Sequence, residues 1–213
     1  VFTGPDACGL LDRLVTNDVA SIAPGRVRYA LVTNERGGIR DDVLVYRFDE
    51  FTMLVVNASN RLKIVDWIEQ QRGEDDVEVV DRTLDWAMLA IQGPRSVELV
   101  TPFVDFPVAE MKYYRCAEAR IHDADGLVSR TGYTGEDGFE LIVPAEKALE
   151  LWQALHDRGT EVGLIACGLG SRDTLRLEAA MPLYGHELDE EIDPYTAGLD
   201  FAVKLDAAEF IGR

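Results

Sequence analysis

The run Ser129–Glu140, with the sequence SRTGYTGEDGFE, limits the possible folds more than any other part of the chain. The segments Gly126–Ser129 and Phe139–Val143 on either side have strand-like patterns, so the run predicts a tight connection between two strands. Its three glycines permit a positive φ and a close approach of the backbone to a ligand. A glycine-rich hairpin with solvated carboxylates explains most of the run. Glu140 does not fit that explanation, because a carboxylate inside a strand must face water or a specific donor.

Apolar periodicity and turn residues predict strands joined by hairpins and interrupted by helices. The expected strands are 26–33, 39–48, 51–57, 77–80, 86–91, 113–121, 126–129 and 139–143. The expected helices begin near residues 4, 60, 94, 144 and 170, with inward positions that include Leu62 and Trp152. This order indicates an α+β fold with largely antiparallel sheets, because a doubly wound parallel sheet requires regular strand–helix–strand units. Neither G-x-G-x-x-G nor P-loop spacing occurs, so nucleotide cofactors are not expected.

Charge and composition exclude several classes of partner. The chain has 39 acidic and 21 basic residues and a net charge of −18, which argues against nucleic acid binding. No apolar run approaches the length of a membrane span, so no membrane partner is expected. The three cysteines and three histidines are scattered, without metal-ligand spacing or a histidine–carboxylate cluster. We therefore expect no disulfide, no protein metal site and a reducing, cytoplasmic location.

Three stretches place polar side chains where a core is expected. Asp42 begins an apolar strand, and its neighbour Asp41 points to the opposite face, so at most one of them is expected in any one pocket. Glu140 belongs to the second stretch. In the third, Arg172 and Arg176 lie one helical turn apart, which is equally compatible with a surface ladder of ion pairs.

These segments, taken in order, resemble the glycine cleavage T-protein family, the aminomethyltransferases. The motifs that carry the resemblance are LxxLVTNDV, NERGGIRDDVLVY, RTGYTGEDGFE, GLGSRDTLRLE and PLYGHELDEEIDP, and they cover essentially the whole chain. The family's N-terminal F-A-G-W-type segment and its C-terminal β-barrel domain are missing. The resemblance therefore implies that 1–213 is the folate-binding region, truncated at both ends.

The family fold implied is two interwoven α+β domains with largely antiparallel sheets around a folate cavity. We expect approximate sub-lobes of 1–50 plus 126–213, and 51–125. The activity implied is transfer of the one-carbon unit of a lipoyl-bound aminomethyl group to tetrahydrofolate, which releases ammonia. The lipoylated carrier protein of the glycine cleavage system, the H-protein, is the implied partner, and no metal is implied.

Five residues match positions of the family's folate site. Asp42 matches the acidic residue beside the reactive end of tetrahydrofolate, where it would stabilise developing positive charge. Tyr29 matches an aromatic residue of the folate pocket. Tyr133 and Glu140 match pterin-binding positions, since a carboxylate can accept two adjacent N–H groups of the pterin edge. Arg172 matches the arginine that completes the site.

Three other functions are compatible with the same fold. One is a folate-dependent demethylase, although those enzymes alter the residues around Tyr133–Glu140. Another is a non-enzymatic folate-binding module, which carries a cysteine in the matching glycine-rich motif, whereas this chain has none between Arg130 and Glu140. The third is a structural fragment or a degenerate paralogue, which the missing termini favour.

Overall fold

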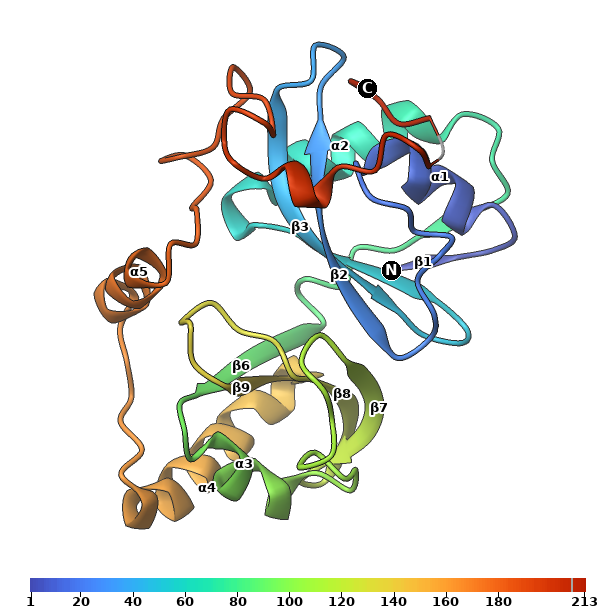
Figure 1. The fold of residues 1–213 in the computed structure, drawn as a ribbon. Helices are drawn as coiled ribbons and strands as arrows, with labels where there is room; N and C mark the ends of the chain where they lie inside the picture. Colours follow the sequence, from blue (N-terminus) through green and yellow to red (C-terminus); the bar gives the residue numbers. More distant parts are fainter. Residues whose placement is uncertain (208) are drawn as a thin grey trace. The chain divides into compact units, whose positions relative to one another are not determined.

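The computed structural model describes residues 1–207 and 209–213, and its contacts divide the chain into two compact units (Figure 1). The first unit combines Val1–Asp81 with Pro182–Arg213, and the second unit is Arg82–Met181. One unit is therefore built from both ends of the chain, with the other inserted between them. In the described residues, no helix is both long and apolar enough to cross a membrane.

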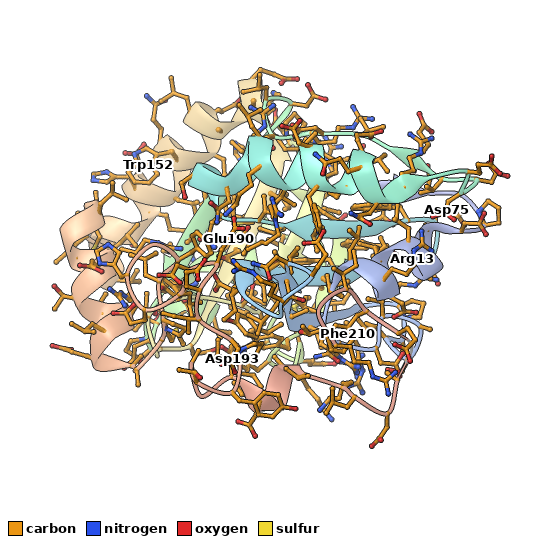
Figure 2. The ribbon with its side chains drawn as sticks, turned by 90° about the horizontal axis from the view of Figure 1, so that it is seen from above. Arg13, Asp75, Trp152, Glu190, Asp193 and Phe210 are labelled. Atoms are coloured by element: carbon orange, nitrogen blue, oxygen red, sulfur yellow. The ribbon has the colours of Figure 1, made fainter. Side chains whose placement is uncertain are left out.

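A five-stranded antiparallel sheet forms the base of the first unit, in the order β2-β3-β4-β1-β5. The strands are β1 (Phe2–Thr3), β2 (Arg26–Thr33), β3 (Ile39–Arg47), β4 (Thr52–Val55) and β5 (Glu78–Val79). Helices α1 (Ala7–Leu14) and α2 (Arg61–Arg72) share one apolar core with this sheet. The core is lined by Leu10, Leu11 and Leu14 of α1, Ile64, Trp67 and Ile68 of α2, and Val43 and Val45 of β3. An ion pair between Arg13 and Asp75, both labelled in Figure 2, links α1 to the loop after α2.

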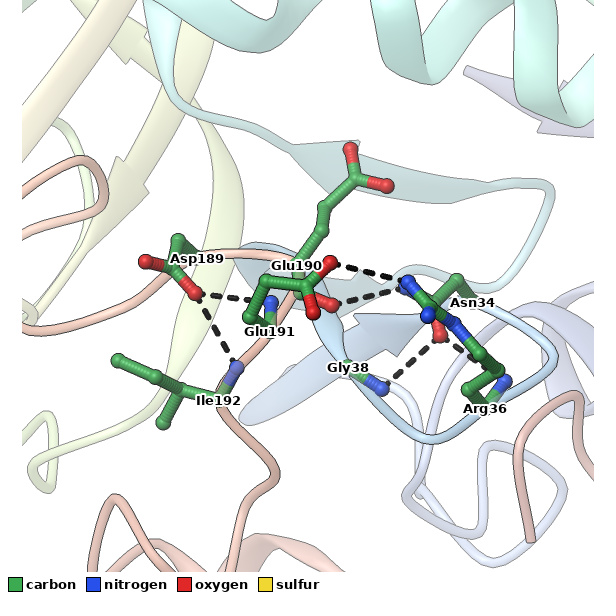
Figure 3. Close-up of polar contacts among 7 residues, drawn as sticks. All are labelled: Asn34, Arg36, Gly38, Asp189, Glu190, Glu191 and Ile192. Carbon is green, nitrogen blue, oxygen red and sulfur yellow. Dashed lines mark hydrogen bonds and ion pairs between the residues drawn. The ribbon is translucent and has the colours of Figure 1, made fainter.

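The turn between β2 and β3 is held by the C-terminal segment of the same unit (Figure 3). The Oδ1 atom of Asn34 accepts hydrogen bonds from the backbone N–H groups of Arg36 and Gly38, at 2.9 and 3.0 Å. The Nδ2 atom of Asn34 donates to the carbonyl oxygen of Glu190 at 3.1 Å. A Cβ atom on Gly38 would lie 1.9 Å from that carbonyl oxygen, so only glycine fits there. The predicted turn is confirmed, and the segment after residue 182 adds a second anchor to it.

The second unit is built on a four-stranded antiparallel sheet in the order β6-β9-β8-β7. Its strands are β6 (Trp86–Gln92), β7 (Cys116–Ile121), β8 (Ala124–Ser129) and β9 (Gly138–Pro144). Its helices are α3 (Ser96–Val100), α4 (Ala148–Gly159) and α5 (Leu169–Glu178). Apolar residues of α3 and α4 share a core with the sheet, notably Leu99, Val100, Phe139, Leu141, Leu151 and Leu155. Helix α5 follows α4 and contributes only Arg176 to the buried residues described.

The predicted α+β class and antiparallel pairing are confirmed, but the division of the chain differs from the expected sub-lobes, 1–50 plus 126–213 and 51–125. Pairing sets the actual division, because β4 continues the sheet of β3 and β6 pairs with β9. Two residues expected in the core are exposed, namely Leu62 at 69% and Trp152 at 48%. Trp152 is labelled in Figure 2. In α2 the inward positions are Ile64, Trp67 and Ile68, which leaves Leu62 on the solvent side.

Candidate functional site

Asp42 lies on β3 of the first unit, half-buried, with both carboxylate oxygens in contact with neutral donors. The Nδ2 atom of Asn57 donates to Oδ1 at 2.7 Å, and the hydroxyl group of Tyr29 donates to Oδ2 at 3.2 Å. Leu31 on β2 lies opposite Asp42. Tyr29 is two positions before Leu31 and therefore on the same face of the sheet, so its side chain can reach Asp42. Burial raises the pKa of Asp42, while the two hydrogen bonds act in the opposite direction. Among the described residues, Asp42 has no ion-pair partner, so its negative charge is not neutralised by the chain.

The ring of Tyr29 also stacks on Phe201, with centroids 5.8 Å apart and an interplanar angle of 25°. Phe201 is 61% exposed, so this aromatic pair presents a flat apolar surface to solvent. The hydroxyl group of Tyr29 meanwhile contacts Asp42. The structure therefore joins the two residues of this unit that the sequence identified, and adds Phe201, which the sequence did not indicate.

Asp41 is the more deeply buried of the two neighbouring aspartates and is 0% exposed. It accepts hydrogen bonds from the backbone N–H of Asn57 at 3.1 Å, from Asn57 Nδ2 at 2.9 Å and from Asn60 Nδ2 at 2.6 Å. Burial raises its pKa to about 6, although these hydrogen bonds lower it. Asp41 and Asp42 share one hydrogen-bond partner, which strand alternation does not predict, because the amide of Asn57 contacts both carboxylates.

The position of Asn57 explains this shared contact. The pairing of β4 with β3 ends at Val55 opposite Leu44, so Asn57 comes level with Asp42 after the chain has left the sheet. From there its side chain reaches residues on both faces of β3. Asn60, which precedes the first residue of α2, makes no capping hydrogen bond with its side chain and binds Asp41 instead. A polar residue ending an apolar strand is the only sequence signal for Asn57.

Glu140 lies within β9 of the second unit and is 7% exposed, as expected for a carboxylate inside a strand. It is opposite Ala90 on β6 and Ser129 on β8. The hydroxyl group of Thr131 donates to Glu140 Oε2 at 2.5 Å, and the hydroxyls of Ser129 and Thr131 are 2.7 Å apart. A chain of hydroxyl groups therefore fixes the carboxylate, and the sequence did not identify these two residues.

Gly132 and Gly138, near Glu140, leave space for the side chain of Gln92. Gln92 Nε2 donates to the carbonyl oxygens of Thr131 and Phe139, at 3.1 and 3.3 Å. A Cβ atom on Gly132 or Gly138 would lie 1.8 or 2.5 Å from the side chain of Gln92. The close approach expected for a ligand is thus occupied, at these two glycines, by a side chain that ties the connection to β6.

Tyr133, in the connection between β8 and β9, contacts Arg172 of α5. The guanidinium carbon of Arg172 lies 4.7 Å from the centroid of the Tyr133 ring, which is cation–π geometry. Arg176, one turn later, is buried and donates to Asp173 at 2.8 Å and to the carbonyl oxygen of Met181 at 3.2 Å. The two arginines therefore differ in environment. Arg172 is exposed and accessible to a ligand, whereas Arg176 stabilises the helix and the turn after it.

A pocket of about 670 Å³ lies in the second unit. Its lining includes Met111, Tyr113, Arg130 and Asp137. Arg130 donates two hydrogen bonds to the carboxylate of Asp137, at 2.8 and 2.6 Å, which lowers the pKa of Asp137. Burial raises the pKa of Tyr113, as do the charges of Glu140 and Asp137. The sequence did not single out Tyr113.

Within residues 1–207 and 209–213, one histidine–carboxylate cluster is found, although none was expected from the sequence. Ligand atoms of His122, Asp123 and Glu150 lie within 4.8 Å of one another on the surface of the second unit. Lys147 Nζ is 2.6 Å from Asp123 and 3.2 Å from Glu150, so a lysine already balances both carboxylates. The fold joins the ends of α4 and β7, which sequence spacing does not reveal.

The sequence matches one family model and several known proteins of the same name. The GCVT N-terminal domain model matches residues 1–207. The chain is 47% identical to an aminomethyltransferase from Symbiobacterium thermophilum and 45% identical to one from Streptomyces coelicolor, with 99% of this chain covered in each case. It spans 58% and 57% of those relatives, so a little over half their length.

Solved structures agree with these matches. The glycine cleavage system aminomethyltransferase T from Bartonella henselae superimposes with a TM-score of 0.89 at 32% identity, over 99% of this chain and 57% of that one. A heterotetrameric sarcosine oxidase from Corynebacterium sp. U-96 gives a TM-score of 0.51 at 16% identity over 68% of this chain. The second similarity concerns the fold alone.

Proposed function

The chain belongs to the aminomethyltransferase family defined by the GCVT N-terminal domain, and on that premise we propose that it transfers a one-carbon unit to tetrahydrofolate. The donor is an aminomethyl group carried as a thioether on a lipoyl arm, and the products are 5,10-methylenetetrahydrofolate and ammonia. The partner is the lipoylated H-protein of the glycine cleavage system, and a cytoplasmic location is part of the same proposal. No metal takes part in this scheme.

One observation carries the proposal, namely the half-buried carboxylate of Asp42 with neutral donors on both oxygens. A carboxylate partly removed from water is costly unless a cation or further donors meet it. Tyr29 and Asn57 orient Asp42 without neutralising its charge. The group is therefore suited to stabilise positive charge that develops on a ligand, which is what this reaction requires.

The proposed chemistry assigns Asp42 an electrostatic role. Loss of ammonia from the aminomethyl group leaves a sulfur-stabilised methylene cation, and N5 of tetrahydrofolate attacks its carbon. The lipoyl sulfur then leaves as a thiol with the N5 proton, which gives an iminium-like cation at N5. N10 attacks the carbon of this cation and loses its proton to ammonia, which closes the five-membered ring. A preorganised carboxylate lowers the energy of the cation without having to reorganise during the step. Proton relay is a weaker role for Asp42, because its contacts include no histidine that would serve as an acid–base partner.

The second unit contributes pterin recognition in this proposal. Glu140 accepts adjacent N–H groups of the pterin edge in a charge-assisted pair, and its place within β9 makes it a rigid acceptor. Tyr133 supplies an aromatic face, and Arg172 adds a cation that the ring of Tyr133 orients. Thr131 holds the carboxylate of Glu140 in place.

The direct test mixes the full-length protein with an aminomethyl-lipoyl carrier, with and without tetrahydrofolate. We expect ammonia release that depends on tetrahydrofolate and forms one 5,10-methylenetetrahydrofolate per ammonia. Sarcosine and dimethylglycine serve as control substrates for the demethylase alternative. Release of no ammonia from the carrier, or one-carbon transfer from a methylamine instead, would overturn the proposal.

A further inference from the structure

Asp41 is a fully buried carboxylate beside Asp42, and the proposed function gives it no role. We propose that Asp41 is a positioning residue, which fixes the side-chain amide of Asn57 and through it the carboxylate of Asp42. This inference rests on the proposed function, because it concerns how the group that stabilises the cation is held. Asp41 itself touches no ligand in this scheme.

The contacts of Asp41 define the place of Asn57 at two points. Asp41 Oδ2 accepts the backbone N–H of Asn57 at 3.1 Å, and Oδ1 accepts its Nδ2 at 2.9 Å. Asn60 Nδ2 donates to the same Oδ1 at 2.6 Å, which fixes the carboxylate from the start of α2. Asp41 therefore holds both the main chain and the side chain of Asn57, in a segment that has already left the sheet.

The orientation of the Asn57 amide is what Asp41 controls. One amide nitrogen has two hydrogens, and here it contacts Asp41 Oδ1 at 2.9 Å and Asp42 Oδ1 at 2.7 Å. A flipped amide would place its oxygen against both carboxylates, where acceptor would face acceptor. The carboxylate of Asp41 thus selects the orientation in which Asn57 donates to Asp42. Without it, only Tyr29 would fix Asp42 from the β2 side.

Asp12 provides a comparison within the same unit. It is also buried, at 8% exposure, and accepts the backbone N–H of Val19 at 2.6 Å. That contact closes the turn after α1 and involves neither Asn57 nor Asp42. Asp12 is therefore a buried carboxylate with a structural role only, which makes Asp12→Asn a matched control.

A double-mutant cycle on the full-length enzyme separates positioning from a merely structural role. We expect Asp41→Asn to lower kcat about 10- to 100-fold, as loss of an outer partner of a functional group does. Both oxygens of Asp41 accept hydrogen bonds from Asn57, and Asp41→Asn replaces one of them with an NH2 group. That NH2 group would face a donor of Asn57. We expect Asp42→Asn to lower kcat about 10²- to 10³-fold. The double variant should be no slower than Asp42→Asn alone, because Asp41 acts through Asp42.

The control and the alternative outcomes are distinct. Asp12→Asn should keep the wild-type kcat even where it lowers the unfolding temperature. If Asp41→Asn does not fold, Asn57→Ala tests the same link, with the same loss of kcat and the same lack of additivity with Asp42→Asn. Multiplicative losses in either cycle, or a wild-type kcat in a folded Asp41→Asn protein, would overturn the inference. A wild-type enzyme that releases no ammonia would instead contradict the proposed function.

Discussion

Protonation of Asp41 should make the first unit more stable at pH 5 than at pH 7. Its folded pKa is about 6, against an ordinary value of 3.8, because burial disfavours the charged form. The folded state therefore binds the proton more tightly than the unfolded state. The contribution to stability is fully present below about pH 4 and is lost as the pH rises to about 6.

The size of the effect follows from the two pKa values. One pKa unit corresponds to about 1.36 kcal/mol. The difference between 3.8 and about 6 therefore corresponds to about 3 kcal/mol of unfolding free energy over the full titration of Asp41. Roughly 1.3 kcal/mol of this falls between pH 5 and pH 7, by the same linkage. That window avoids the acidic limit, where a chain with a pI of about 4.5 loses its net charge.

The assay compares urea unfolding of the wild type and of Asp41→Asn at pH 5, 6 and 7. Trp67 is buried in the first unit, so its fluorescence in a Trp86→Phe/Trp152→Phe background reports on the unit that contains Asp41. Relative to Asp41→Asn, the wild type should lose about 1.3 kcal/mol from pH 5 to pH 7. Asp49→Asn, which removes an exposed carboxylate of the same unit, controls for net charge. A difference between wild type and Asp41→Asn that is constant with pH would refute the reasoning.

Two further predictions test other parts of the account. Glu140→Gln should weaken tetrahydrofolate binding by about 2–3 kcal/mol in a calorimetric titration, because a charged acceptor becomes partly a donor; equal affinity would remove Glu140 from the pterin site. Gly38→Ala should lower the unfolding free energy by about 1–3 kcal/mol, because the added Cβ would lie 1.9 Å from the carbonyl oxygen of Glu190. Gly9→Ala, in the open face of α1, should instead raise it by about 0.5–1 kcal/mol, and equal thermal shifts for the two would contradict the close contact.

Local pattern was sufficient to predict most strands and helices. Residues 26–33 form a strand as expected, and the turn that follows Thr33 has the predicted hairpin form. Periodicity could not decide which side of α2 is buried, since Leu62 and Ile64 are equally apolar and only packing against β3 distinguishes them. The division into units also depends on pairing between distant strands, such as β6 with β9, which local patterns do not contain.

The candidate site was predictable only in part, for a related reason. Asp42 and Glu140 were identifiable because a carboxylate in an apolar strand is costly. Their partners Asn57 and Thr131 were not, since neutral polar residues near strand ends are common and their contacts depend on how the chain leaves the sheet. Strand alternation predicted that Asp41 and Asp42 point to opposite faces of β3. It gives no information on a partner they share beyond the end of β4.

The most direct test of the central claim is single-turnover ammonia release by Asp42→Asn in the full-length protein. The substrate is an aminomethyl-lipoyl carrier at saturating tetrahydrofolate. If Asp42 stabilises the cation formed during transfer, the rate should fall by about 10²–10³, or roughly 3–4 kcal/mol, with little change in tetrahydrofolate affinity. A wild-type rate combined with a raised dissociation constant for tetrahydrofolate would contradict the claim and leave Asp42 with a binding role alone.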